Sequence, residues 1–491
     1  MLFNSLPFML FFPVVVILYF IIPHRYRYIW LLFCSYFFYA CQDHSATVLL
    51  MVSTVITWSA GRLVYNADTQ KLKRTYVAVG FILNLFILMY FKYSGFIMSF
   101  FRPDGSFDII LPAGISFYTF QSLTYIADCY REETEPEHNI LKYALFVSFF
   151  PCILSGPIER SKNLLSQIGE EHKWDSIRVK EGLFMMLWGY FLKMVIVGRL
   201  SILTDHVYSG AGTNEALYPG AVQNAGGYTG IPMIIALIAY SFQIYCDFAG
   251  YSFIAIGAAR VLGFRIMKNF RQPYLAVSVS DFWRRWHISL STWFRDYLYI
   301  PLGGSRCGTL RRYINIMIVF AVSGIWHGAT FNFLVWGILF GIYQVMGYAA
   351  VPVKKKMGEK FGLSGKEGAG RILCIAFTYV LVSITWLFFR AGSVYEALDE
   401  LRRTFTDIRL SQLTDGTVSG LGLGVMNLIF VIFAIVILIM VDITCERRDC
   451  EVYSLLDRTP AVLRWSAYYL LFTMIIFSCN LSTQEFLYQG F

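Results

Sequence analysis

The chain has 491 residues, of which 57% are apolar and only 15% are charged, whereas a soluble domain carries about 25% charged residues. This composition excludes a soluble globular protein and predicts a polytopic membrane protein with many spans of about 20 residues. The net charge of +9 fits the Lys and Arg surplus at cytoplasmic ends, so nucleic-acid binding is not expected. The ten cysteines lack CxxC or metal-ligand spacing, so we expect neither a disulfide framework nor a metal site.

Basic clusters set the predicted orientation of the N-terminal spans. Met9–Ile22 reads as a retained first span, because no basic segment and no small-residue cleavage site mark it as a signal peptide. His24–Arg27 follows this span and Lys71–Arg74 follows the third, while Cys41–Ser45 between them has no Lys or Arg. The positive-inside rule therefore places the N-terminus outside. A fourth span is predicted from Thr75 to about Phe100.

Two short apolar segments come next, Leu111–Ala127 and Leu141–Pro157, and a loop rich in Lys and Arg follows them. If both segments crossed the membrane, this basic loop would lie outside. One segment is therefore predicted to be re-entrant or to lie flat. We favour the first, because it opens with Pro112 and Gly114 and carries polar residues that include Gln121.

The central part of the chain is predicted to cross twice and then to lie at the inner face. Gly182–Leu203 crosses outward, Asp205–Gly230 has no Lys or Arg as expected of an outer loop, and Ile231–Leu262 crosses back. Ten Arg and Lys residues lie between Arg260 and Arg312. Trp283, Trp286 and Trp293 in this stretch suit helices at the level of the lipid headgroups.

The remaining chain is predicted to form a hairpin and three further spans. The apolar run Tyr313–Val353 is too long for one span and is interrupted at Gly324–Gly328. Ser393 and Glu396 have capping-box spacing before an amphipathic helix at 393–408, on the outer surface. The three spans are roughly Ile372–Phe389, Leu421–Val441 and Trp465–Cys479. We therefore expect one domain with roughly 10–12 crossings of about 20 residues, divided into N-terminal spans (1–100), a catalytic core (101–353) and C-terminal spans (354–491).

Two histidines within apolar sequence are the first candidate site residues. A polar ring at membrane depth is costly and is usually kept for a task. Gly324 and Gly328 flank His327 at a spacing that lets another helix or a thin substrate arm approach the imidazole. Arg284, His287 and Ser291 fall at three- and four-residue spacing, which predicts that they share a helix face.

Other polar residues leave two interpretations open. Gln243 and Asp247 lie four residues apart on one helical face, where they could hold helices together or line a site. Arg284, Arg285 and Arg295 could reach the interface simply as cytoplasmic cations. Their clustering around one intramembrane histidine makes a phosphate cradle the alternative.

Four stretches carry long motifs: Pro112–Ser122, Ser280–Trp293, Arg295–Gly304 and Gly324–Gly328. They resemble the membrane-bound O-acyltransferase superfamily, and most closely its branch of alginate O-acetylation membrane subunits, with similarity along the whole chain. The resemblance implies an all-α, polytopic helical dish with re-entrant and interfacial helices. It also implies a cytosolic funnel for an acyl thioester and an opposing outer funnel.

The resemblance also suggests roles for the histidines. In that superfamily the histidine matching His327 is catalytic, and the one matching His287 lies nearby in the tunnel. Transfer of an acyl group from a thioester to a hydroxyl independently needs a base of near-neutral pKa and a group that stabilises the oxyanion. We therefore expect His327 to be the general base and His287 to position substrate or stabilise the oxyanion. Whether a covalent acyl-enzyme forms stays open.

The remaining candidates are assigned to the donor and to the tunnel. No bound cofactor is expected, and the donor substrate is acetyl-CoA or another acyl thioester. The residues expected to bind the donor are Arg284, Arg285, Arg295, Trp283 and Trp286. Those expected to line the tunnel are Ser291, Asp247, Gln243, Gln121, Trp326 and Asn332.

The predicted function is transfer of an acyl group, most plausibly acetyl, from a cytosolic thioester toward an exported polysaccharide. The protein would be multi-pass in a bacterial plasma membrane, with both termini outside and an SGNH-hydrolase-like partner on the outer side. One alternative is D-alanyl transfer to teichoic acid from a carrier protein. Another is a proton-coupled transporter with His327 and Asp247 as a relay, although the sequence shows no internal repeat. A catalytically silent scaffold is the third.

Overall fold

The computed structural model describes residues 1–101, 111–209, 227–351, 368–456 and 459–479, and within these ranges the regular structure is helical, without strands. The described residues divide into two compact units. Unit 1 contains residues 1–101, 111–190 and 251–269, and unit 2 contains the rest. The predicted outer loop falls largely on 210–226, and the basic run at 354–356 also lies outside the described residues.

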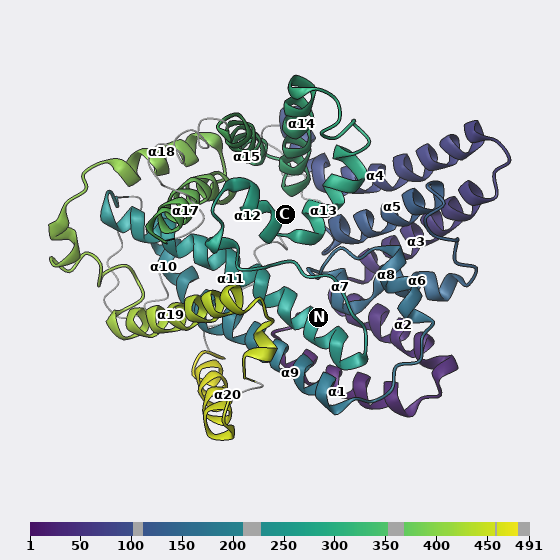
Figure 1. Cartoon of the computed structure of the whole chain (residues 1–491), viewed down its shortest axis with the longest axis horizontal. Coiled ribbons are helices and arrows are strands. Elements are labelled where there is room, and N and C mark those ends of the chain that lie inside the picture. The colour runs from purple at the N-terminus through teal and green to yellow at the C-terminus, as the bar shows by residue number, and fades with distance from the viewer. Residues whose placement is uncertain (102–110, 210–226, 352–367, 457–458, 480–491) are drawn as a thin grey trace. The chain divides into compact units, whose positions relative to one another are not determined.

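Unit 1 is built from the N-terminal helices (Figure 1). They are α1 (Leu6–Ile21), α2 (His24–Ala40), α3 (His44–Tyr65), α4 (Gln70–Phe101), α5 (Ile115–Tyr130), α6 (Ile140–Ser148), α7 (Phe150–Ile153), α8 (Ser161–Ile168) and α9 (Ser176–Tyr190). Side-chain caps fix several starts: Ser5 caps α1, Asp43 caps α3 and Asn139 caps α6. Helices α3, α4 and α5 pack on one another, and α5 is buried along almost its whole length.

The two short apolar segments after the fourth predicted span form helices of different lengths. Helix α5 runs for 16 residues from Ile115, directly after the Pro112–Gly114 turn. Helix α6 has only nine residues and ends at Ser148, before a separate turn that contains Pro151. Nine residues rise about 14 Å, which is about half of a hydrocarbon core. Pro112 and Gly114 therefore start a helix, and which of the two segments is re-entrant or lies flat stays a prediction.

Unit 2 contains the central and C-terminal helices. They are η1 (Phe191–Val197), α10 (Gly198–Ser209), α11 (Ile231–Leu262), η2 (Pro273–Leu275), α12 (Val279–Arg285), α13 (Ile288–Phe294), η3 (Arg295–Tyr299), α14 (Thr309–His327), α15 (Phe331–Ala349), α17 (Gly368–Arg390), α18 (Val394–Phe405), η4 (Leu410–Leu413), α19 (Val425–Arg448), η5 (Val452–Leu456) and α20 (Ala461–Ile476). Residues of α11 from Tyr251 onward belong to unit 1. The bounds of α11 are those predicted for the span Ile231–Leu262.

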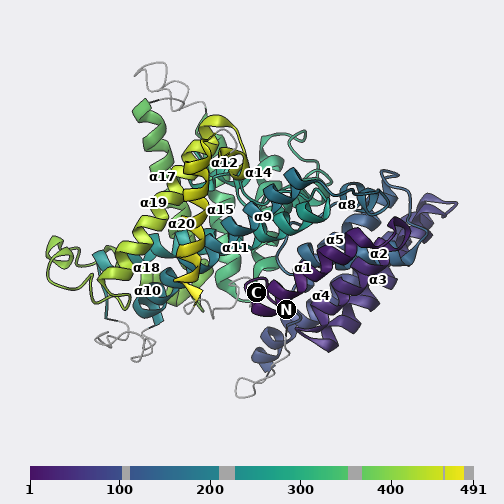
Figure 2. The ribbon, with the colours of Figure 1, turned by 90° about the horizontal axis from the view of Figure 1, so that it is seen from below.

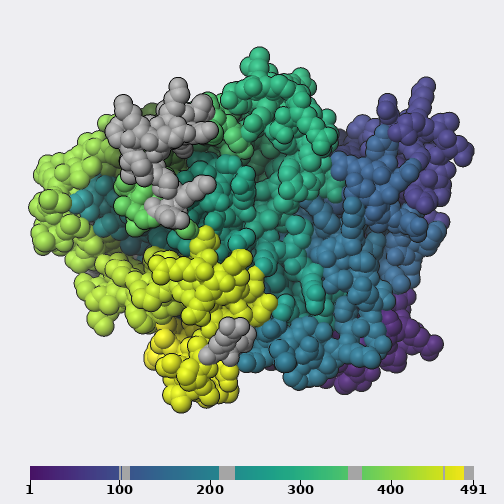
Figure 3. Space-filling view, in the orientation of Figure 1, coloured from purple at the N-terminus to yellow at the C-terminus, as the bar shows by residue number. Residues whose placement is uncertain are grey.

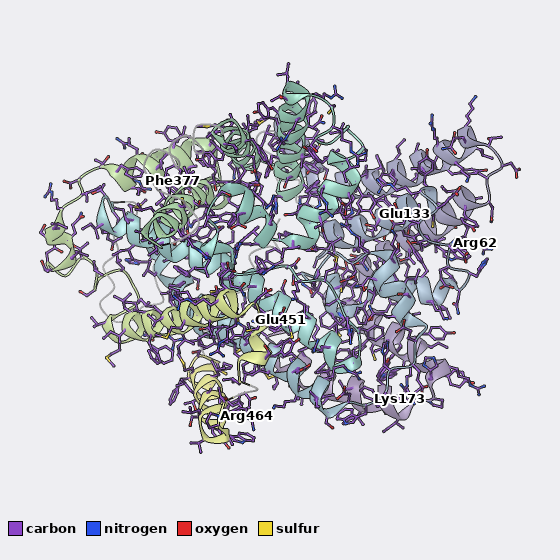
Figure 4. All side chains as sticks on the ribbon, in the orientation of Figure 1. Arg62, Glu133, Lys173, Phe377, Glu451 and Arg464 are labelled. Atoms are coloured by element: carbon purple, nitrogen blue, oxygen red, sulfur yellow. The ribbon has the colours of Figure 1, made fainter. Side chains whose placement is uncertain are left out.

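The prediction of an all-α polytopic membrane protein is confirmed. Among the described residues, seven helices are long and apolar enough to cross a membrane, and two shorter apolar helices accompany them. This is fewer than 10–12, because α1, α2, α5, α6 and α20 have only 9 to 17 residues. The long apolar helices expose large apolar side chains. One example is Phe377 of α17, which is 66% exposed (Figure 4). Such exposure suits contact with lipid tails.

The long run after residue 313 forms the predicted hairpin. Helices α14 and α15 lie side by side, and the turn between them follows His327 directly (Figure 1). Glycines let the two backbones approach closely: a Cβ added at Gly324 would overlap the carbonyl oxygen of Phe333, and one at Gly337 would overlap that of Phe320. The position of His327 is therefore set by the contact between the backbones of two helices.

Helix α18 begins with Ser393 as its N-cap, as predicted, without the reciprocal bond of a full capping box, and it packs through an unexpected face. The Ser393 hydroxyl accepts a hydrogen bond from the backbone N–H of Glu396 at 3.2 Å, and the Glu396 carboxylate accepts from the N–H of Gly392 at 2.9 Å. The apolar residues Leu398 and Phe405 point outward, and the helix and the segment after it form part of the surface in Figure 3. The face that packs against α15 and α17 instead carries Ala397, Glu400 and Thr404.

The first prediction tests the close contact between α14 and α15. Gly337→Ala should lower the thermal midpoint of the purified protein in detergent, because overpacking at a tight contact costs about 1–3 kcal/mol. Gly347→Ala on the same helix is the matched control, since nothing lies within 4 Å of a Cβ added there. Equal midpoints for the two variants would contradict the contact.

Candidate acyl-transfer site

His327 ends α14 inside a group of aromatic rings. It is 3% exposed, and Gly328 caps the helix directly after it. Its ring centroid lies 4.8 Å from that of Trp326, 4.8 Å from that of Trp336 on α15 and 5.4 Å from that of Phe389 on α17. Three helices therefore hold one imidazole in a mostly apolar setting, where a base is shielded from bulk water.

His287 occupies a break between two short helices. Helix α12 ends at Arg285, Trp286 is extended, and His287 has a left-handed backbone with φ 43° before α13 begins at Ile288. A non-glycine residue in this region is strained by about 1–3 kcal/mol. The prediction that Arg284, His287 and Ser291 share a helix face was wrong, because the helix is interrupted between the first and the last of them. The break turns His287 inward, 1% exposed, while Arg284 is exposed.

The two histidines share an aromatic neighbour. The ring of His287 lies 6.2 Å from Trp326, whose ring also contacts His327, and 4.6 Å from Phe248 on α11. Burial lowers the pKa of His287 to about 3. Its imidazole is therefore neutral at pH 7, with one ring N–H that can donate a hydrogen bond.

A cavity of about 260 Å³ lies in unit 2 between α12, α13, α14 and α15. It is lined by Trp283, Leu290, Ser291, Phe294, Arg295, Tyr299, Ile316, Val319, Phe320, Ser323, Gln344 and Tyr348. Trp283 also contacts Trp336 at 5.8 Å between ring centroids, and Trp336 contacts His327. The indole of Trp283 thus connects the cavity wall with the rings around the histidine.

Two buried polar atoms in the cavity wall have no hydrogen-bond partner within the described ranges. They are Nε1 of Trp283, a donor, and Oε1 of Gln344, an acceptor. The amide nitrogen of Gln344 donates to the carbonyl oxygen of Val279 at 3.4 Å. Buried polar groups are normally satisfied, so this donor and acceptor suit an occupant that carries a polar group such as an amide.

Two of the tryptophans predicted for the headgroup level are buried in unit 2. Trp286 is 1% exposed and packs against Phe270, Phe282 and Trp386, with ring centroids 4.9 to 5.4 Å away. Trp293 is buried as well. Aromatic packing in unit 2 therefore fixes both rings, and their level in the membrane stays a prediction. A donor-binding role for Trp283 and Trp286 stays a prediction, with Trp283 alone lining the cavity.

The three predicted donor-binding arginines have different surroundings. Arg285 forms a two-pronged ion pair with Glu446, with Nη1 to Oε2 at 2.7 Å and Nη2 to Oε1 at 3.0 Å, and it also contacts Asp281. Arg295 lines the cavity and pairs with Asp296 next to it. Arg284 is exposed. The geometry makes Arg285 a link between α12 and α19. Of the three arginines, Arg295 lines the cavity, and a donor-binding role for all three stays a prediction.

Asp247 and Gln243 face the helix segment that contains η1 and α10. The Asp247 carboxylate lies 2.5 Å from Nζ of Lys193, and both side chains are at most 2% exposed. Gln243 accepts a hydrogen bond from the hydroxyl of Thr204 at 2.7 Å. Lys193 lies in a π-helical stretch, Phe191–Val197, a feature that often occurs at functional positions. These contacts favour the interpretation that Gln243 and Asp247 hold helices together.

Gln121 and Asn332 also make specific backbone contacts. Gln121 belongs to unit 1, where its amide donates to the carbonyl oxygen of Phe146 at 2.5 Å. Asn332, in the first turn of α15, donates to the carbonyl oxygens of Phe388 at 3.1 Å and Ala391 at 2.7 Å at the end of α17. Asn332 therefore fixes the end of α17 beside the turn that follows His327. Roles for both residues in a tunnel stay predictions.

Comparison with known proteins decides the family. A family model for membrane-bound O-acyltransferases matches residues 18–350, more than half of the chain and inclusive of both histidines. The chain belongs to the membrane-bound O-acyltransferase family. The Probable alginate O-acetylase AlgI of Pseudomonas aeruginosa is 36% identical over 448 residues, which cover 88% of this chain and 81% of that protein.

Two further relatives show the breadth of the family. The Peptidoglycan O-acetyltransferase of Helicobacter pylori is 31% identical over 405 residues, covering 76% of this chain and 73% of the relative. The Teichoic acid D-alanyltransferase of Bacillus subtilis is 27% identical over 292 residues, covering 56% and 68%. The chain is therefore a multi-pass membrane protein and an O-acyltransferase, which supersedes the transporter and scaffold alternatives.

Several residues of the acyltransferase were not predicted from its sequence. Trp336, Phe389 and Phe248 surround the two histidines, and each is one aromatic residue among the 87 Phe, Tyr and Trp of the chain. Lys193 gave a usable signal that was overlooked, because a lone lysine within an apolar span needs an anionic partner. Groups of three or more His, Cys, Asp or Glu that could hold a metal do not occur in the described part of the chain.

The second prediction concerns the Lys193–Asp247 pair. Lys193→Met should strongly lower the thermal midpoint in detergent, since removing one partner of a buried ion pair costs about 3–5 kcal/mol. Lys193→Met combined with Asp247→Leu should recover most of the loss and should retain acyl transfer. A double variant as unstable as the single one would contradict the pair, and an active double variant would exclude a proton relay through Asp247.

Proposed function

We propose that this acyltransferase moves an acetyl group from a cytosolic thioester to a hydroxyl of an exported polysaccharide, in a bacterial plasma membrane. The observation that carries the proposal is the position of His327, enclosed by rings that connect to a cavity, in a member of an O-acyltransferase family. A base held in this way can activate one hydroxyl while water is excluded.

The relatives favour acetyl transfer to a polysaccharide. The two bacterial proteins named as O-acetylating alginate or peptidoglycan are 31% to 36% identical and cover 76% to 88% of this chain. The D-alanyltransferases are 27% to 28% identical over 56% to 58% of it. D-alanyl transfer is therefore the second candidate.

The reaction can be followed through the ring of His327. The acceptor oxygen attacks the thioester carbonyl carbon while a ring nitrogen of His327 takes the hydroxyl proton. The tetrahedral intermediate then breaks its C–S bond, and the departing thiolate receives the proton from the imidazolium. One C–O bond forms and one C–S bond breaks, so no other reactant is needed.

His287 suits the oxyanion side of this reaction. Its low pKa keeps the imidazole neutral, so one ring N–H can donate to an oxygen that becomes negative. A protonated imidazolium would instead be costly to bury. The left-handed backbone and the contacts with Phe248 and Trp326 hold the ring in one place. Pre-orientation of this kind supports the oxyanion without rearrangement during the reaction.

The cavity is the proposed site of the donor arm. Coenzyme A and a carrier protein's phosphopantetheine both carry two amides between a phosphate and the thioester sulfur. The partnerless Nε1 of Trp283 and Oε1 of Gln344 offer one donor and one acceptor for such an amide. Arg295 at the cavity provides a cation for phosphate. The donor is a substrate in this scheme, and no resident cofactor is required.

The proposal includes a direction and a partner. The donor enters from the cytosol, both chain termini lie outside, and the acyl group leaves toward the outer face. There an SGNH-hydrolase-like protein receives it or completes transfer to the polymer. The support for this arrangement is the positive-inside pattern of the sequence and the resemblance to the alginate O-acetylation branch.

The third prediction tests His327. His327→Ala should lower the maximal rate of acyl transfer by about 10²-fold or more, because general base catalysis typically contributes about 10²–10⁴-fold. Polymer acetylation in cells and thiol release by the purified protein are the measurements. His206→Ala is the control, since His206 is equally buried but lies elsewhere in unit 2. Near-normal acetylation in the His327 variant would remove it from the catalytic role.

The fourth prediction tests the donor site. Arg295→Lys should raise the Michaelis constant for the thioester with little effect on the maximal rate, because phosphate binding is common to ground and transition states. Arg285→Lys should instead lower the thermal midpoint, as it loses the two-pronged contact with Glu446. If the Michaelis constant for the thioester is unchanged in Arg295→Lys and Arg284→Lys, neither arginine binds the donor. Both would then act only as cytoplasmic cations that set the membrane orientation.

A further inference from the structure

The end of α17 is fixed against the surroundings of His327 at consecutive residues. Phe388 and Ala391 offer their carbonyl oxygens to the amide of Asn332, and Phe389 between them contacts the ring of His327. Phe389 also packs against Phe333 and Trp336 on α15, with ring centroids 5.2 and 5.5 Å away. The position of this helix end therefore bears directly on the imidazole.

Arg390 is the charged residue of this helix end. Its Nη1 lies 3.3 Å from Oε1 of Glu400 on α18, and its Nη2 lies 3.8 Å from Oδ1 of Asp205 on α10. Its guanidinium carbon lies 4.2 Å from the ring centroid of Tyr208. The side chain is only 12% exposed. Helix α17 packs against α18, which carries Glu400 (Figure 2). A cation held this way fixes the end of α17 more firmly than a solvated one would.

Glu400 is unusual because it lies on the packed face of an amphipathic helix. It is fully buried, next to Ala397 and Thr404, although apolar residues such as Leu398 lie on the outer face of the same helix. Burying a carboxylate is costly unless it is paired, so packing alone would favour an apolar residue here. The ion pair with Arg390 offsets the cost of burying this carboxylate.

We propose that Arg390 is a positioning residue for His327, and that the ionised carboxylate of Glu400 holds it in place. When the pair is intact, the end of α17 keeps Phe389 against the imidazole and keeps Asn332 at its two carbonyls. When Glu400 is neutral, this hold weakens and the rate of acyl transfer falls. The inference rests on the proposed role of His327 as the base.

The charged and titratable groups around Glu400 set the pH range in which the Arg390–Glu400 pair is formed. Arg390 faces it from α17, Tyr208 from α10, Tyr240 from α11, and Glu396, Asp399 and Arg403 lie on its own helix. The N-terminal part of α15, Phe331–Ile342, carries no ionisable side chain. Burial raises the pKa of Glu400 to about 7, while Arg390 opposes the rise. The carboxylate is therefore ionised above about pH 7, and the pair is lost as the pH falls through this value.

The fifth prediction is that Glu400→Gln removes this pH dependence. Gln has the shape of the protonated acid, so the maximal rates of wild type and variant should agree at about pH 5.5. At about pH 8.5 the wild type should be faster by about fivefold, the lower end of typical coupling between sites. The donor Michaelis constant should not change. The assay is thiol release by the full chain in lipid nanodiscs, with thermal midpoints to show that both proteins are folded.

Two further variants sharpen this test. Arg390→Lys keeps the charge but loses the planar fork, so it should recover part of the rate that Arg390→Met loses at high pH. Arg402→Gln is the control, because it removes an exposed ion pair with Asp399 on the same helix, and its rate should match wild type at every pH.

The outcomes separate this inference from the proposed function. A wild-type to Glu400→Gln ratio that stays constant across pH, at one or at any other value, would overturn the inference. Activity retained by His327→Ala would overturn the proposed function instead. A ratio that rises with pH while His327→Ala is inactive would support both.

Discussion

The close approach of α14 and α15 is the constraint on which the rest of the site depends. Gly324 and Gly337 leave no room for a Cβ, so the helices pack backbone against backbone and His327 ends α14 beside the first turn of α15. This contact also brings Trp336 to the imidazole. In a membrane, where helices gain little from burying apolar side chains, such packing is a main source of specificity.

The sequence was sufficient to predict a helix or turn wherever a single strong pattern of hydropathy, glycine spacing or charge occurs. Three features were predictable because hydropathy, glycine spacing and cap chemistry are local: the bounds of α11, the hairpin broken after His327 and the N-cap at Ser393. The helix break at His287 was not, since no glycine or proline marks it. Tertiary packing of Trp286 overrides the three- and four-residue pattern there.

The site itself was only partly predictable for the same reason. Both histidines could be selected because polar rings in apolar sequence are rare, and the structure places them around a shared neighbour, Trp326. Their other contacts, Phe248 and Phe389, come from helices distant in sequence. In a chain with 18% aromatic residues, composition gives no way to choose among them.

The left-handed backbone of His287 has a consequence for how the protein balances activity and folding. The φ of 43° favours glycine, so the side chain of His287 is kept at an energetic cost of about 1–3 kcal/mol. His287→Gly would relax the backbone while discarding the ring, whereas His287→Ala would discard the ring and keep the strain. Under the oxyanion role proposed for His287, His287→Gly would give a more stable chain but a poorer catalyst. Selection for stability and selection for turnover would then oppose each other at this residue.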